Sequence, residues 1–404
     1  MISREFRRYY TFLLTCSLIP YVPYIFPFFP ENILGFNMTG WAWIMIFFVS
    51  LFKLFNIKNI SFPSQYWLPW IIYLVINLII DFSFLGLQLT LQYILPIIIG
   101  LICSSFKYNA ISLIWLFKQF SKLCILVFGL FIFGFFFRDG YTAASASTPM
   151  LISIYVSILI GLFFLTKKIK YILYYILFFM IPFLDVTRMG IAAFLVILIF
   201  HFANVKLFNK LLFSFFGIFI VLIVFNSKGF QEKTFHSGSG KITDFSLNFY
   251  ENDEINNNGR QTWRLALEPG LIAKPFFGNG PRNDAQILII ASNNTIKEAH
   301  NDYLSVRYNY GYIGLIILFY GIIFTFKDIY FKVKIVNNNY SWLIGKSILT
   351  LFLSFLMFMY SDNILKYTIY FPNIFFAMIG IFYSLNKNGL IQIPISKVEL
   401  IKYD

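Results

Sequence analysis

The chain has 404 residues, of which 59% are hydrophobic, 21% aromatic and only 12% charged, and its mean hydropathy is +0.72. A soluble chain of this length would have about a quarter of its residues charged, so this composition excludes a water-soluble protein. We therefore expect a polytopic membrane protein in which residues 1–404 form one integral membrane domain.

Runs of mostly apolar residues occur along the whole chain, and roughly 20 such residues suffice for a helix to cross a bilayer. The first run follows a basic start, MISREFRRYY, which is typical of a signal peptide. This run is too long for a signal peptide, and no small-residue cleavage site follows it, so it is predicted as an uncleaved span. The expected fold is all-α with about twelve spanning helices: 9–28, 38–55, 66–84, 88–105, 112–137, 149–166, 169–184, 189–205, 209–226, 309–327, 341–360 and 367–386.

One connection, residues 227–308, is much longer than the others and joins the ninth and tenth predicted spans. It starts with Gly-, Ser- and Asn-rich chain and continues with RQTWRLALEPGLIAKPFFGNG, where apolar residues recur at roughly helical spacing. We expect one or two helices there that lie along the membrane interface. Connections of this length are usually functional.

The basic residues set the expected orientation, because they gather on the cytoplasmic side of membrane proteins. With the N-terminus inside, the inner segments hold 20 of the 32 basic residues and four of the 18 acidic ones. The outer segments then hold 12 basic and 14 acidic residues. The net charge of +14 therefore indicates topology and not nucleic-acid binding. Both termini are expected in the cytoplasm and the 227–308 connection outside.

Several arginines on the outer side are candidates for binding an anion. Arg188 lies between the seventh and eighth predicted spans, where it could bind an anion or pair with a neighbouring aspartate. Arg260 and Arg264 are four residues apart, so they share one helical face, and they follow an Asn/Gly run where a helix would begin. That arrangement suits a phosphate, although a solvated interfacial face remains the alternative. Arg282 and Arg307 are weaker candidates of the same kind.

The chain has three histidines, and one of them has a distinctive setting. His201 and His236 are interpreted as structural. His300 lies in the polar stretch KEAHNDYLS just before the tenth predicted span. Its near-neutral pKa suits it to taking a proton from a hydroxyl, although a structural hydrogen-bonding role remains open.

Other catalytic signals are absent from the sequence. No second histidine stands at metal-ligand spacing from the first, and there is no Asp-x-Asp pair, no Gly-rich phosphate loop and no G-x-S-x-G turn. We therefore expect chemistry that needs neither a metal nor another cofactor and that depends on arginine and histidine.

The order of these motifs resembles the bacterial O-antigen ligase and polymerase superfamily. A Thr-Arg pair lies between two spans, a large outer loop carries an Arg and then K-P-F-x-G-x-G, and H-N-D-Y-L precedes Y-G-Y-I-G-L at the next span. The resemblance covers residues 185–320 and the twelve-span topology.

The resemblance implies a membrane glycosyltransferase whose donor glycan is linked to undecaprenyl pyrophosphate. By motif, Arg188 and Arg260 hold the pyrophosphate and His300 helps to activate the acceptor hydroxyl. These three are the expected catalytic residues. We add as expected substrate-binding residues Arg264, from its place on the Arg260 face, and Asn301, Asp302 and Tyr303.

Within the superfamily, the sequence E-A-H-N-D-Y-L and the late S-D-N-I-L stretch (361–365) favour an O-antigen polymerase, which adds the growing chain to the next lipid-linked repeat. The alternatives are a ligase that adds the glycan to the lipid A core and, less favoured, a flippase for lipid-linked oligosaccharides. A flippase would need charges through both leaflets, whereas these candidates gather on the outer side. The expected location is the bacterial inner membrane with the active site facing the periplasm. The expected partners are the lipid-linked oligosaccharide, membrane lipid and a chain-length regulator protein, without nucleic acid.

Overall fold

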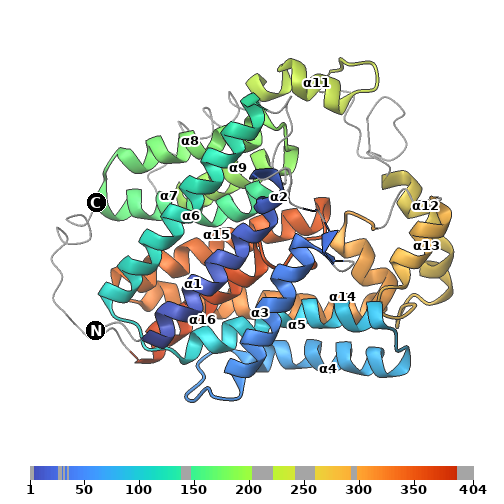
Figure 1. The fold of residues 1–404 in the computed structure, drawn as a ribbon, viewed down its shortest axis with the longest axis horizontal. Helices are drawn as coiled ribbons and strands as arrows, with labels where there is room; N and C mark the ends of the chain where they lie inside the picture. Colours follow the sequence, from blue (N-terminus) through green and yellow to red (C-terminus); the bar gives the residue numbers. More distant parts are fainter. Residues whose placement is uncertain are drawn as a thin grey trace.

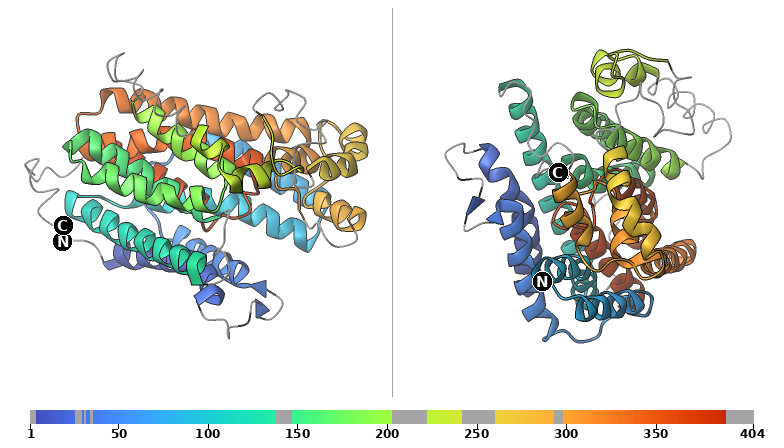
Figure 2. Two further views of the ribbon diagram at one scale, coloured as in Figure 1. Left: turned by 90° about the horizontal axis from the view of Figure 1, so that it is seen from above. Right: turned by 90° about the vertical axis from the view of Figure 1, so that its right-hand side faces the viewer.

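A computed structural model of the chain describes residues 4–25, 30, 32–33, 36–137, 147–202, 222–241, 260–292 and 298–388. Most of these residues are helical, and the long helices pack side by side into an elongated bundle (Figures 1 and 2). The helices are α1 (Arg4–Leu18), η1 (Ile19–Tyr21), α2 (Val22–Ile25), α3 (Met38–Leu54), α4 (Ser64–Ile80), α5 (Phe84–Ser105), α6 (Ala110–Phe137), α7 (Ser147–Thr166), α8 (Lys170–Leu184), α9 (Arg188–Phe202), α11 (Lys228–Thr234), α12 (Arg260–Ala273), α13 (Asn283–Ala291), α14 (Asp302–Ile335), α15 (Asn339–Ser361) and α16 (Pro372–Asn388). Two short strands, β1 (Asn32–Ile33) and β2 (Phe36–Asn37), pair antiparallel.

Five of the described helices are long and apolar enough to cross a membrane, namely α5, α6, α7, α14 and α15. Four shorter helices, α3, α4, α8 and α9, are also apolar. The expectation of an all-α membrane protein is confirmed. The count of twelve spans stays a prediction, and most of the ninth predicted span, 209–226, lies outside the described residues.

The boundaries of several helices differ from the sequence-based prediction. α14 begins at Asp302 rather than at 309, and the last helix begins at Pro372 rather than at 367. At the start of the chain, α1 ends at Leu18 and a 3-10 turn containing Pro20 follows, because proline has no N–H to continue the helical ladder. Apolar runs therefore located these helices, whereas capping residues and prolines determined where they begin and end.

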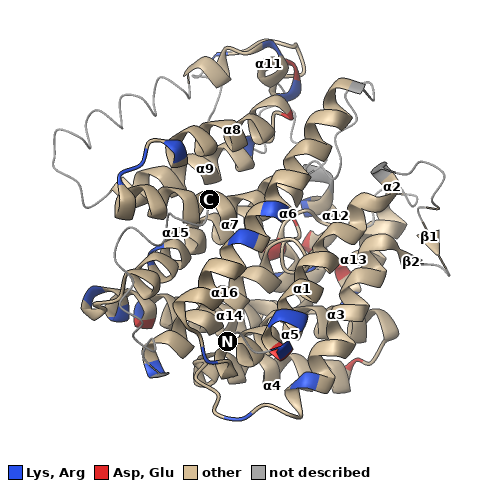
Figure 3. Cartoon of the chain, turned by 60° about the vertical axis from the view of Figure 1, so that its left-hand side comes forward, with Lys and Arg blue, Asp and Glu red and all other residues tan. Residues whose placement is uncertain are grey.

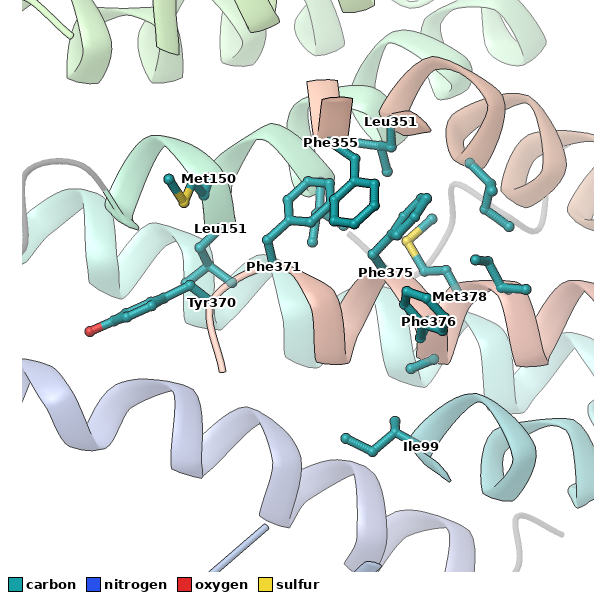
Figure 4. Close-up of a cluster of buried hydrophobic side chains, with 14 of the residues drawn as sticks. Ile99, Met150, Leu151, Leu351, Phe355, Tyr370, Phe371, Phe375, Phe376 and Met378 are labelled. Carbon is teal, nitrogen blue, oxygen red and sulfur yellow. The ribbon is translucent and has the colours of Figure 1, made fainter. Parts of the chain in front are cut away.

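The core of the bundle is rich in phenylalanine. Phe355 of α15 stacks on Phe371 with ring centroids 5.9 Å apart, and Phe371 lies 5.2 Å from Phe375 of α16 (Figure 4). α16 also packs closely along α5, where Gly380 lies against the backbone of Gly100 so tightly that a side chain at 380 would clash. Small residues at such crossings let two membrane helices approach closely.

The two ends of the bundle carry different segments. The beginning of α1 and the end of α16 lie at one end, and α12 and α13 lie at the other (Figure 1). The connection between α4 and α5 belongs to the second end, because Asn283 of α13 donates a hydrogen bond of 2.8 Å to Asp81. We call the second end the α12–α13 end and the first the termini end.

The termini end carries small charged clusters that join neighbouring helices. Lys53 of α3 pairs with Glu5 of α1. Asp328 of α14 pairs with Lys332 at 2.5 Å and accepts a hydrogen bond from Tyr383 of α16. Figure 3 shows that most of the helical ribbon carries no charged residue, although basic segments also occur within the length of α6. This scarcity of charge fits helices that are surrounded by lipid.

Candidate active site

His300 lies at the α12–α13 end, in the short link that leads into α14. Its Nδ1 is 3.0 Å from Oδ1 of Asp362, which follows directly after α15. The same carboxylate oxygen accepts the backbone N–H of Asn363 at 2.8 Å. A carboxylate only accepts hydrogen bonds, so Nδ1 of His300 carries the proton and Nε2 keeps its lone pair. His300 has the orientation of a general base.

His300 is exposed and its partner Asp362 is buried, so a substrate hydroxyl could reach the histidine while the carboxylate holds it. The side chain of His300 is 47% exposed, whereas that of Asp362 is 9% exposed. The hydrogen bond to Asp362 raises the pKa of His300 above its usual value, against the opposing effect of partial burial, and the Asp362 and Glu298 charges add to the rise. An exposed histidine whose pKa is raised is a stronger base once it is deprotonated.

The start of α12 lies beside this histidine. The ring of Trp263 is 5.5 Å from that of His300, centroid to centroid. Arg260 is the first residue of α12, less than one turn before Trp263, and Arg264 follows Trp263 directly and is exposed. The side chain of Arg260 lies outside the described part of the structure. The backbone thus brings the predicted Arg260–Arg264 pair and His300 into one neighbourhood, next to a helix N-terminus that favours anions.

The three residues after His300 hold the start of α14 in place. Asn301 is the N-cap, and its Oδ1 accepts the N–H of Leu304 at 3.0 Å. Asp302 is fully buried, and its Oδ2 accepts the N–H of Leu365 at 2.9 Å. Tyr303 donates from its hydroxyl to the carbonyl of Leu356 at 2.7 Å. These contacts give all three residues a role in positioning His300, and their predicted contacts with substrate stay predictions.

A network of four charged side chains lies beneath His300 and Asp362 and helps to hold them in place. Arg282 pairs with Glu298, and Lys366 lies 3.6 Å from Oδ2 of Asp284 and 3.9 Å from Oε2 of Glu298. The Lys366 side chain is only 3% exposed. Burial alone would raise the pKa values of both carboxyls, but Lys366 and then Arg282 hold the pKa of Asp284 and of Glu298 below the usual range. Both acids therefore remain ionised, and the network is a set of paired charges.

This network fixes Arg282, which the sequence presented as a weaker anion-binding candidate. Its guanidinium is engaged by Glu298, which also accepts a hydrogen bond of 3.0 Å from the side chain of Asn363. Asn363 is next to Asp362, so the pairing of Arg282 contributes to holding the partner of His300. Arg307, the other weaker candidate, lies over the ring of Tyr312 at 4.6 Å.

The two glycine-containing motifs meet through their backbones. In the K-P-F-F-G-N-G loop, Asn279 N donates to Tyr308 O at 2.8 Å and Gly280 N donates to Asn309 O at 3.0 Å.

Gly311 interrupts α14 with φ 65° and ψ −170°, and a side chain there would clash with the carbonyl of Phe276. This break frees Tyr312 N to donate to Pro275 O at 2.9 Å. The loop before α13 is therefore built against residues 308–313 of α14, which follow His300 in the chain.

Arg188 begins α9 and is half-buried. The other end of α9 packs near the last third of α7 and the start of α15, since His201 and Ser347 both lie near Gly161. α9 and α15 pack along each other and run in opposite directions, so the Arg188 end of α9 points toward the end of α15, where Asp362 follows. Arg188 thus belongs to the α12–α13 end together with His300.

Sequence reasoning did not single out several residues of this site. Asp362 lies in the S-D-N-I-L stretch that was used only as a family signal, and its partnership with His300 spans 62 positions. Lys366 and Glu298 were counted only as charges. The available signal was an acidic or basic residue within a few positions of a predicted span, which is costly unless it is paired.

Among the side chains that the structure describes, no group of three or more His, Cys, Asp and Glu could hold a metal ion. The predicted independence of metals needs its own experiment and stays a prediction.

Residues 173–319 match the family described as O-antigen ligase. This match supports the O-antigen ligase and polymerase superfamily. The matched segment includes Arg188, the whole of α12 and His300, but it ends before Asp362. The family covers both ligases and polymerases, which are glycosyltransferase-like enzymes acting on lipid-linked glycans. No curated protein matches the chain.

Proposed function

We propose that the protein is an O-antigen polymerase that transfers a growing glycan from undecaprenyl pyrophosphate to the next lipid-linked repeat unit. The observation that carries this proposal is the His300–Asp362 pair, with Nδ1 held at 3.0 Å and the side chain half-exposed. A histidine that is fixed by a buried carboxylate and open on its other side is suited to removing a proton from an acceptor hydroxyl.

In the proposed reaction, Nε2 of His300 takes the proton of the acceptor hydroxyl. The acceptor oxygen forms a bond to the anomeric carbon of the donor glycan, and the bond from that carbon to the pyrophosphate oxygen breaks. Undecaprenyl pyrophosphate leaves with the bonding electrons, and Arg188 and Arg260 neutralise its charge. Guanidinium groups suit this task because they bind phosphate oxygens in a two-pronged manner. His300 then releases its proton to water.

Among the predicted substrate-binding residues, Arg264 is exposed on α12 next to Trp263. We place it beside the donor phosphates or the first sugars. Exposed apolar side chains surround this region, among them Leu265, Ile272, Phe276 and Phe277. They support a position of α12 and its following loop at the membrane interface, where a lipid-linked donor would present its pyrophosphate.

The ligase remains the second candidate, because the matching family is described as O-antigen ligase. Deleting the gene and running the surface polysaccharide on a gel separates the two. Loss of a polymerase leaves core carrying one repeat unit, whereas loss of a ligase leaves bare core. Bare core in the deletion strain would overturn the polymerase assignment, and an unchanged ladder would overturn both.

We further propose that the protein lies in the bacterial inner membrane with both termini in the cytoplasm and with the 227–308 segment and the site in the periplasm. A chain-length regulator protein is a proposed partner there. Reporter fusions at Lys168 and Lys334 are expected to report the cytoplasm, and fusions at Gly240 and Asn363 the periplasm. A cytoplasmic signal at Gly240 would place the 227–308 segment on the wrong side and would contradict the proposed site.

A further inference from the structure

A groove between α6, α7 and α8 lies away from the candidate active site. These three helices enclose a cavity of about 570 Å³. Residues of all three helices line it, and Figure 1 shows the three helices next to one another. A space of this size is typical of sites that bind small molecules or cofactors.

Most of the groove is apolar. Its walls and floor include Ile125 and Phe128 of α6, Leu159 of α7, and Leu177 and Phe178 of α8. Ile125 is 58% exposed and Leu177 is 43% exposed, so the groove opens at the side of the bundle. In a membrane this side faces lipid, and an acyl chain can enter without crossing water.

One part of the same groove is basic. Lys118 and Lys122 of α6 and Lys170 at the start of α8 line it, and none of the described lining residues is acidic. Lys118 and Lys122 are one helical turn apart on the same face, so one phosphate can contact both ammonium groups. Lysine binds phosphate as a compact positive charge.

The basic part of the groove lies far from His300. α7 begins at the α12–α13 end, because Thr148 hydrogen-bonds Tyr21 at 3.1 Å and the ring of Tyr21 packs edge-on against Tyr370. α7 then runs toward Thr166, and α8 starts four residues later at Lys170. The three lysines therefore lie toward the termini end, where they cannot contact a phosphate bound beside His300.

We propose that this groove binds an anionic phospholipid, with its phosphate at Lys118, Lys122 and Lys170 and an acyl chain along the apolar part. The charge of the groove complements a phosphodiester, and its apolar side is continuous with the lipid-facing surface. Under the proposed topology this lipid belongs to the cytoplasmic leaflet, whose anionic lipids are attracted by basic residues near the membrane surface. The site does not depend on the assignment as polymerase.

Native mass spectrometry of the purified full-length protein tests the proposal, with dioleoylphosphatidylglycerol and dioleoylphosphatidylcholine as the probes. The triple variant Lys118→Gln, Lys122→Gln, Lys170→Gln is expected to bind phosphatidylglycerol at least about tenfold more weakly than the native protein. Phosphatidylcholine binding is expected to be weak and equal in both. The matched control is Lys58→Gln, Lys107→Gln, Lys334→Gln, which removes three exposed lysines outside the groove. It is expected to bind phosphatidylglycerol like the native protein.

Two further measurements distinguish a site that binds the whole lipid from a basic patch that attracts any anion. Leu177→Trp fills the apolar part without changing any charge, and it is expected to weaken phosphatidylglycerol binding as well. Inorganic phosphate at millimolar concentration is not expected to displace the lipid, because it lacks the acyl chains. Equal losses in the groove and control triple variants, unchanged binding in Leu177→Trp, or displacement by inorganic phosphate would each overturn the proposal.

Discussion

The two ends of the helical bundle use charge in different ways. At the termini end, charged side chains join neighbouring helices in small clusters, as in Lys332 with Asp328, where both side chains remain partly exposed. At the α12–α13 end, Lys366 is 3% exposed and lies between two carboxylates that come from different segments. The first arrangement is inexpensive because water still solvates the ions, whereas the second requires every charge to be paired.

His201 and His300 also differ in how their surroundings hold the ring. His201 is buried and its Nδ1 contacts the carbonyl of Ile197 within its own helix, 2.9 Å away. His300 is half-exposed, and its Nδ1 contacts a carboxylate from another helix. The other ring nitrogen of His201, Nε2, is buried without a hydrogen-bond partner among the described residues, whereas the ring of His300 is held at Nδ1 and half-exposed. Only the setting of His300 gives a substrate hydroxyl access to the ring, which supports the chemistry proposed for the α12–α13 end.

The largest expected effect comes from removing the base. His300→Ala is expected to lower glycan transfer by ~100- to 10,000-fold, because a positioned base contributes that much, while donor-lipid binding stays nearly unchanged. His300→Gln keeps hydrogen bonding but cannot act as a base near neutral pH, so it is expected to be similarly inactive. Chain lengths on a gel and transfer by the purified enzyme are the measurements.

His201→Gln is the matched histidine change away from the site, and it is expected to retain transfer at equal expression. Near-native chain lengths in His300→Gln cells would remove His300 from the mechanism and would leave the two histidines equivalent.

The next largest effect is expected at the arginines. Arg188→Ala and Arg260→Ala are each expected to lower transfer by about 100- to 1,000-fold, because the leaving pyrophosphate loses a partner for its growing charge. Arg188→Lys and Arg260→Lys are expected to recover little of this, since lysine keeps the charge but loses the two-pronged grip. Initial rates with purified enzyme, at matched membrane insertion, measure this loss.

Arg7→Ala, at the termini end, serves as the control for the arginine variants, and its activity is expected to match the native protein. Full activity in either lysine variant would show that the arginine contributes only its positive charge and not two-pronged binding of the phosphate.

A third prediction concerns pH. The hydrogen bond to Asp362 raises the pKa of His300, so the histidine stays protonated to a higher pH and the basic form appears only above that raised value. The acidic limb of the kcat/KM profile is therefore expected above pH 6.5 and is expected to move to lower pH in Asp362→Asn. Transfer at neutral pH should fall, but less than in His300→Ala.

Asp328→Asn is the matched carboxylate change at the termini end, and it is expected to leave the pH profile in place. An acidic limb that does not move in Asp362→Asn would show that the His300–Asp362 contact does not control the base.

Removing a paired lysine is expected to destabilise the protein more at the α12–α13 end than at the termini end. Lys366→Met leaves Asp284 and Glu298 buried with Arg282 alone, so the free energy of unfolding is expected to fall by about 3–5 kcal/mol. Lys332→Met, at the partly exposed pair, is expected to cost at most about 1 kcal/mol. Melting temperatures in the same detergent measure both. Equal shifts would show that burial of the Lys366 network has no energetic consequence.

The smallest expected effect is that of a chelator. Because the proposed chemistry relies on arginines for charge neutralisation, transfer by purified enzyme is expected to be unchanged in excess chelator. Loss of activity that magnesium or manganese restores would show that the arginines do not suffice.

The sequence predicted much of the fold, for a physical reason. Apolar runs of about 20 residues identify helices that lipid can surround, and the positions of α3 to α9 and α14 to α16 followed from them. The breaks at Pro20 and Gly311 depend on local backbone conformation, which hydropathy does not record. Spacing placed Arg260 and Arg264 on one helix, because four residues make about one turn.

The site was predicted only where its residues are neighbours in the chain. His300 and the residues up to 303 stood out as a polar stretch before a span. The contacts of His300 with Asp362 and of Glu298 with Lys366 join residues more than 60 positions apart, and no local pattern specifies such a pairing. The role of Asp302 was also missed, because a buried carboxylate that receives the Leu365 N–H looks in the sequence like any other acid.

The segment of α14 around the break at Gly311 and the rest of the helix make different contacts. Residues 308–313, on both sides of Gly311, are joined backbone to backbone with residues 275–280, whereas the rest of α14 packs mainly against α4 and α15. A hybrid enzyme that received residues 298–313 from a relative would therefore need the 274–284 segment of that relative as well. The membrane-crossing part of α14 could stay unchanged.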